Sequence, residues 1–147
     1  MLLDVEKAPP ATSSGENADH DTGVAVIFTS VEPTLRALQE AGALARRLDA
    51  RVTLVVPQLV PHPLPLTSPP VLREFNERRF RIIAGATMVE TDVLIYLCRD
   101  RWDALAIALK PHSLVVIGGH RRWRSSEERL ARKLRRAGHV VIFLEVE

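Results

Sequence analysis

The chain has 147 residues, of which 46% are hydrophobic and 26% charged, with a net charge of +2. This length suffices for one domain with a single core, and a lone cysteine excludes a disulfide-stapled scaffold or a zinc site built on several thiolates. No apolar run approaches the ~18 residues that cross a bilayer, and acids stand where a signal peptide needs basic residues. These features predict a cytoplasmic protein without a membrane partner.

The N-terminal residues 1–22 differ in composition from the rest of the chain. They are poor in aromatics and rich in Ser, Pro, Ala and acids, with five carboxylates against Lys7. Such a segment buries too little apolar surface to offset its ordering entropy, so we predict a flexible acidic arm. The folded domain is then expected to span residues 23–147.

Apolar runs of strand type alternate with segments of helical periodicity in the rest of the chain. The strand-like runs are 23–30, 51–60, 91–98, 113–119 and 139–146. Runs that are apolar on both faces of the pleat belong to strands covered on both sides, and alternation with helices is typical of βαβ units. The pattern predicts an α/β three-layer sandwich with a five-stranded parallel sheet and four helices.

Local signals mark where several of these elements begin and end. Pro57 is expected to stop the second strand, so that residues 57–70 form a proline-rich loop. Asp100 is the expected N-cap of a short helix. Ser125, with Glu128 three residues later, forms a candidate capping box, and Gly138 suits the position after that helix ends.

The most informative candidate site lies between the strand SLVVIGG (113–119) and the helix that follows it. In an open parallel sheet, ligands bind outside the carboxyl ends of the strands. Two glycines let backbone N–H groups approach a phosphate, a helix N-terminus offers unpaired N–H donors, and arginines lie between them. The candidate nucleotide- or anion-binding residues are Thr29, Gly118, Gly119, Arg121, Arg122, Ser125 and Ser126.

Structural roles are an alternative explanation for each of these residues. A glycine pair can serve a turn, a serine before a helix can be a simple cap, and loop arginines are usually solvated. Cys98, at the end of an apolar strand, fits a buried structural thiol better than a nucleophile. We find no metal-ligand spacing, no catalytic triad and no phosphate-binding loop motif, so we predict neither an enzyme nor a metal site.

The order of the elements, and above all LVVIGG through RRAGHVVIFLEV, resembles the universal stress protein family of adenine nucleotide α-hydrolase-like domains. The resemblance covers residues 23–147. It implies a sheet order of 3-2-1-4-5, a cytoplasmic location and a homodimer built through the last strand.

The chain departs from the nucleotide-binding branch of that family. In that branch the first strand ends in an acid and the fourth leads into G-x2-G-x9-G-[ST], whereas Thr29 and Arg121 stand at two of these positions here. Ala131 and Arg132 replace the last two residues of the signature. The chain therefore resembles the branch without the signature, and no cofactor is expected. If ATP or another adenine nucleotide does bind, the arginines must supply the charge.

Three functions remain as hypotheses. The first is a non-enzymatic, homodimeric regulatory module of the stress-response type, because the edge strand 139–146 would otherwise expose an apolar ladder. The second is a sensor that binds a nucleotide or another small anion at the loop 118–126. The third, a surface for nucleic acid or an acidic partner on the last helix, is not favoured, because charge runs usually form a solvated face.

The net charge of +2 hides a division along the chain. Residues 1–22 carry −4 and residues 119–138 carry +6. These two segments are expected to attract each other, within one chain or across a dimer.

Overall fold

The computed structural model describes residues 3–4, 23–60, 70–120 and 125–146 of the chain. Its strands are β1 (Leu3–Asp4), β2 (Gly23–Ile27), β3 (Arg51–Leu59), β4 (Thr91–Cys98), β5 (Leu114–His120) and β6 (Val140–Val146). Its helices are α2 (Val31–Leu48), α3 (Pro70–Ala84), the 3-10 turn η2 (Gly85–Thr87), α4 (Arg101–Ala108) and α5 (Ser126–Arg136).

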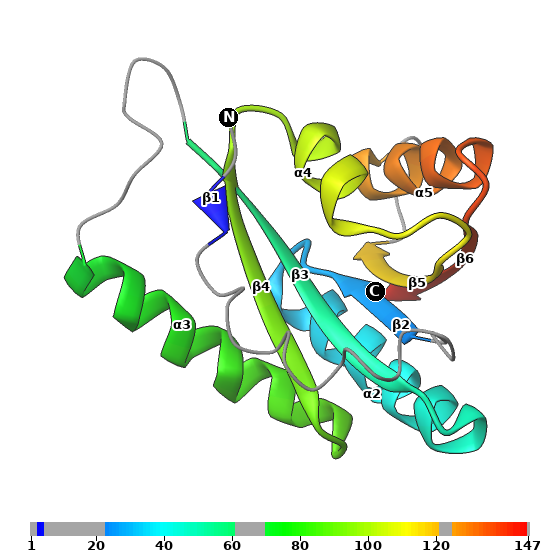
Figure 1. The fold of residues 1–147 in the computed structure, drawn as a ribbon. Helices are drawn as coiled ribbons and strands as arrows, with labels where there is room; N and C mark the ends of the chain where they lie inside the picture. The colour runs from blue at the N-terminus through cyan, green and yellow to red at the C-terminus, as the bar shows by residue number, and fades with distance from the viewer. Residues whose placement is uncertain (1–2, 5–22, 61–69, 121–124, 147) are drawn as a thin grey trace.

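The strands form one sheet in the order β1-β4-β3-β2-β5-β6, in which the five strands from β2 to β6 are parallel. Leaving β1 aside, this is the predicted order 3-2-1-4-5, which is confirmed. β1 is an addition that the sequence did not predict. It pairs antiparallel with β4, with Leu3 opposite Leu97 and Asp4 opposite Tyr96 (Figure 1).

Helices cover both faces of the sheet, as the doubly apolar strands require. α2 and α3 lie on one face, and α4 and α5 lie on the other (Figure 1). Alternate residues of β2 divide between the two cores, with Val26 against α2 and Ile27 toward α4 and α5. The predicted three-layer sandwich with four α-helices is therefore confirmed.

The prediction that Pro57 stops the second strand is wrong, because β3 continues to Leu59. The Val55 carbonyl accepts a hydrogen bond from the Phe28 N–H, and the Val60 N–H donates to the Cys98 carbonyl. In this part of β3, the backbone N–H and C=O groups of odd-numbered residues therefore point toward β2, and those of even-numbered residues point toward β4. The N–H that Pro57 lacks would point toward β2. Because β2 ends at Ile27, opposite Val55, the proline costs the sheet no hydrogen bond between paired strands. Pro70, also placed in the predicted loop, is the first residue of α3; residues 61–69 lie outside the described part.

The predicted caps at Asp100 and Ser125 are confirmed, whereas the reciprocal bond of a full capping box, from the Ser125 N–H to the Glu128 carboxylate, is not found among the described residues. The Asp100 carboxylate accepts a hydrogen bond from the Trp102 N–H at 3.0 Å, and the Ser125 hydroxyl accepts one from the Glu128 N–H at 3.1 Å. Gly138, with a φ of 102°, follows α5. No helix in the described ranges is both long enough and apolar enough to span a membrane.

A histidine stabilises the point where the edge strand β6 begins. The Ser113 N–H donates to His139 Nδ1 at 3.0 Å, and the Val140 N–H donates to the Ser113 carbonyl at 3.0 Å. His139 Nδ1 must be unprotonated to accept this bond. Burial, and then the nearby His112, lower the pKa of His139.

We expect this histidine to make the stability of the fold depend on pH. The pKa of His139 in the folded state lies below its unfolded value of about 6.5, so the unfolded state binds more protons in acid. Its contribution is therefore fully present above about pH 6.5 and declines as the pH falls through that value. In His139→Asn, an amide oxygen can accept the same bond without titrating. Urea unfolding between about pH 7.5 and 5.5 should show a smaller loss of stability in this variant than in the unmodified chain; equal losses would contradict the assignment.

Candidate functional site

The two glycines at the end of β5 pack against both neighbouring layers. A Cβ on Gly118 would lie 2.1 Å from the carbonyl oxygen of Pro33, in the first turn of α2. A Cβ on Gly119 would lie 2.8 Å from Cβ of Glu127 and 2.9 Å from the ring of Phe143. Both positions are buried, so close packing accounts for both glycines. That their N–H groups also contact an anion stays a prediction.

Thr29 joins the ends of the two central strands. Its hydroxyl donates to the Gly118 carbonyl at 2.8 Å, and its N–H donates to the hydroxyl of the buried Thr34 at 3.0 Å. β2 and β5 are the strands between which the chain order reverses, the usual place for a ligand in such a sheet. Thr29 therefore stands at the predicted location, with its hydroxyl proton already donated to β5.

The two serines at the start of α5 have different environments. Ser125 is 9% exposed and caps the helix through its hydroxyl. Ser126 is exposed, and its hydroxyl lies 3.4 Å from the Glu127 carboxylate. Of the two, Ser126 is the one that faces open space. Arg121 and Arg122, the cationic part of the predicted site, lie outside the described residues.

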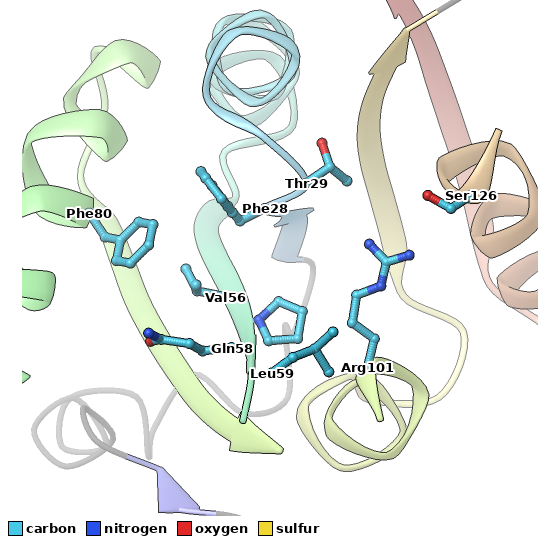
Figure 2. Close-up of a pocket in the computed structure, with 9 residues that line it drawn as sticks. Phe28, Thr29, Val56, Gln58, Leu59, Phe80, Arg101 and Ser126 are labelled. Carbon is cyan, nitrogen blue, oxygen red and sulfur yellow. The ribbon is translucent and has the colours of Figure 1, made fainter. Parts of the chain in front are cut away.

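An open depression of about 480 Å³ lies over the carboxyl ends of β2 and β3. Figure 2 shows Thr29 and Ser126 on one side of it, with Phe28 and Phe80 on another. Its lining residues come from β3, α3, α4, α5 and the segment after β2: Phe28, Thr29, Val56, Pro57, Gln58, Leu59, Phe80, Arg101 and Ser126. The depression thus brings together two of the predicted site residues, Thr29 and Ser126.

Arg101 contributes a cation that sequence reasoning missed. It is the first residue of α4, and Figure 2 shows its side chain extending from the helix toward the side where Thr29 and Ser126 lie. Within the described part of the chain its guanidinium makes no hydrogen bond or ion pair. Asp100 could have revealed this position in the sequence. An N-cap that directly follows a parallel strand places the first residue of the helix at the edge of the sheet where ligands bind.

The opposite wall of the depression is aromatic and apolar. The rings of Phe28 and Phe80 meet edge to face with centroids 5.1 Å apart, and the Arg79 guanidinium lies 5.5 Å from the centroid of Phe80. Leu59, at the end of β3, is 56% exposed. The depression therefore has one cation and two hydroxyl oxygens on one side and an apolar wall on the other.

Cys98 lies near this depression but is buried in the core between the sheet and the helices α4 and α5, which we call the second core. Its thiol lies 3.8 Å from the Gln58 carbonyl, to which it donates. Burial, and then the charges of Asp100 and Asp103, raise the pKa of the thiol. A thiol kept protonated is a poor nucleophile, which agrees with its predicted structural role. Among the described side chains, no group of three His, Cys, Asp or Glu residues could hold a metal ion.

The sequence matches no protein-family model and no curated protein. The fold, in contrast, matches solved structures. One is a universal stress protein family member from Burkholderia pseudomallei, 20% identical, with a TM-score of 0.56 over 85% of this chain and 96% of that one. A second is a universal stress protein in complex with cAMP, 15% identical, with a TM-score of 0.57 over 86% and 98% of the two chains.

A third similar structure is a universal stress protein from Archaeoglobus fulgidus, 15% identical, with a TM-score of 0.54 over 84% of this chain and 93% of that one. All three neighbours carry the same description, and each is covered almost entirely by this chain. The chain has a universal-stress-protein-like fold, as its sequence pattern predicted.

Proposed function

We propose that this chain is a non-catalytic regulatory domain of the universal stress protein type that acts as a homodimer through β6. The observation that carries this proposal is the position of β6 at a sheet edge, with β5 as its partner on the other side. Val140, at its start, is 62% exposed. An edge with unpaired backbone groups and apolar side chains favours pairing with a second copy.

The lining of the depression supports a role without catalysis. None of its described lining residues is a carboxylate, a histidine or a thiol, the groups that most often act as general base or nucleophile. The nearest thiol, that of Cys98, is held protonated. A single buried cysteine also fits the proposed cytoplasmic location.

The oligomeric state tests the proposal. Size-exclusion chromatography with light scattering should give a dimer for the unmodified chain and a monomer for Val140→Lys, because a lysine on an edge strand blocks pairing. Ile82→Lys is the matched control: Ile82 is 79% exposed on α3, away from β6, and this variant should remain a dimer. An unmodified chain that is monomeric at tens of micromolar would overturn the proposal.

A second candidate function is the binding of a small anionic ligand. The specific observation is the guanidinium of Arg101, which has no hydrogen-bond or ion-pair partner among the described residues. The hydroxyls of Thr29 and Ser126 line the same depression, but each donates its proton within the protein, to the Gly118 carbonyl and to the Glu127 carboxylate. Arg101 is therefore the lining group that would attract an anion. One similar structure holds cAMP, so cAMP, AMP and ATP are suitable probes. The packed glycines and the absent signature favour a ligand other than ATP bound in the family's usual manner.

We expect the affinity for such a probe to depend on Arg101. Losing a hydrogen bond to a charged group costs about 1.5–3 kcal/mol, so Arg101→Ala should weaken binding roughly 10- to 100-fold in a calorimetric titration. Arg46→Ala, on the exposed last turn of α2, should leave it unchanged. The double variant Arg121→Ala/Arg122→Ala measures how much the loop arginines contribute to the binding free energy. Absence of heat and of any thermal shift with all three probes at millimolar concentration would remove this candidate.

A further inference from the structure

The outer side of α5 is a continuous basic surface. Its inner side, with Leu130, Ala131 and Leu134, is buried against the sheet. The first turn of the helix has an exposed serine and two half-buried glutamates, and beyond that turn every exposed residue of the helix is a cation. We call this surface the basic face; it comprises Arg129, Arg132, Lys133, Arg135 and Arg136.

This arrangement carries an electrostatic penalty that the described residues offset only in part. Arg132 and Arg136 are four positions apart on the helix, as are Arg129 and Lys133, and each like-charge pair destabilises a helix by about 0.2–0.5 kcal/mol. The Lys133 ammonium lies 4.6 Å from the centroid of the Trp102 ring, and Arg135 donates to the Val141 carbonyl at 3.1 Å. Glu128 stands four positions before Arg132, a favourable spacing, but within the described ranges neither Arg132 nor Arg136 makes an ion pair.

The complementary charge is found in the N-terminal segment of the same chain. Residues 5–22, which follow β1, carry four carboxylates and one lysine, a net charge of −3. The described strands fix this segment at two points, because Asp4 ends β1 at one edge of the sheet and Gly23 begins β2 near its centre.

The length of the segment allows it to reach α5. Eighteen residues lie between Asp4 and Gly23, and a chain of that length spans up to about 60 Å when extended. Six strands at about 4.8 Å spacing give a sheet about 24 Å wide. The extended length of the segment is more than twice the width of the sheet, so α5 lies within its reach.

We propose that the basic face of α5 is an interaction surface for the acidic segment 5–22 of the same chain. Each exposed ion pair contributes little alone, about 0–1 kcal/mol. Several pairs act together here, and the tether at Asp4 and Gly23 keeps the acids at an effective concentration on the order of millimolar. The contact is electrostatic and weakens as the salt concentration rises, because the Debye length falls from about 30 Å at 0.01 M to about 3 Å at 1 M. The inference is independent of dimerisation and of ligand binding.

The full-length chain, labelled with nitrogen-15, tests the contact by NMR. Raising the salt from about 20 to 500 mM should shift the amide signals of residues 5–22 and of α5 together, up to a common plateau. In Arg132→Glu/Arg136→Glu, the segment's signals should already lie at the plateau positions in low salt. The control Arg46→Glu/Arg47→Glu makes the same change of charge at exposed positions of α2, on the other face of the sheet, and should behave like the unmodified chain.

A second variant approaches the contact from the acidic side and leaves the folded domain untouched. Glu16→Gln/Asp19→Asn/Asp21→Asn should move the α5 signals toward their high-salt positions. Segment signals that ignore both salt and the α5 double variant, or that respond equally to the α2 control, would overturn the proposal. Shifts that grow with protein concentration would overturn it in favour of a contact between two copies.

Discussion

Replacing Gly118 with alanine is expected to lower the free energy of unfolding by about 3 kcal/mol. The new methyl group would lie 2.1 Å from the carbonyl oxygen of Pro33 and 2.7 Å from its carbonyl carbon. Both atoms belong to the backbone of α2, so no side-chain rotation relieves the contact. Overpacking of this kind typically costs about 1–3 kcal/mol, and backbone contacts lie at the upper end of that range. Any shift of β5 away from α2 would also stretch the Thr29–Gly118 hydrogen bond.

Gly85→Ala is the matched control for this prediction. A Cβ at Gly85 meets nothing within 4 Å, so the same substitution should change the stability little or raise it by up to about 1 kcal/mol through the unfolded state. Urea unfolding followed by circular dichroism gives both values from the midpoint and slope of the transition. A loss at Gly118 no larger than that at Gly85 would show that β5 and α2 are not in close contact.

The sheet could be predicted from the sequence because its central strands are covered on both faces and its edge strand β6 is also apolar at most positions. The runs SLVVIGG and HVVIFLEV are apolar at consecutive positions. In the structure they form β5, inside the parallel sheet, and β6, which pairs with β5 at the edge. The helix starts at Asp100 and Ser125 were predictable for a different reason. A cap is a contact within three residues, so the local sequence contains both partners.

The errors and omissions concern contacts between residues far apart in the sequence. Whether Pro57 breaks a strand depends on which neighbour its missing N–H would face and on where that neighbour ends. The pairing of Leu3 and Asp4 depends on a free edge at β4, which exists only once the sheet is assembled. Neither piece of information is present in the local sequence.

The candidate site shows the same limit. A glycine pair after a strand suits both a phosphate cradle and close packing between layers, and the sequence alone cannot separate the two. In the structure, protein atoms fill the space beside Gly118 and Gly119. The location at the carboxyl ends of the central strands was predicted through Thr29 and Ser126, whereas the cation that completes it, Arg101, comes from α4.

The position of Arg101 depends on how firmly α4 is held, and Leu105 is the side chain that holds it. α4 has 8 residues, too few to be stable alone, and Leu105 is 0% exposed in the second core. Leu105→Ala should therefore lower the free energy of unfolding by about 2–5 kcal/mol, the range for deleting a buried leucine side chain. A cavity under α4 should also loosen Arg101 and weaken binding of any anion that depends on it.

Ile107, on the outer side of the same helix, provides the comparison. It is 66% exposed, so Ile107→Ala should change the free energy of unfolding by no more than about 0.5 kcal/mol. The two variants remove aliphatic side chains two positions apart, and both leave Asp100 and its cap intact. Equal losses in urea unfolding would mean that α4 is not packed through Leu105. A loss confined to Leu105→Ala, accompanied by weaker anion binding in that variant, would show that the second core positions Arg101 at the depression.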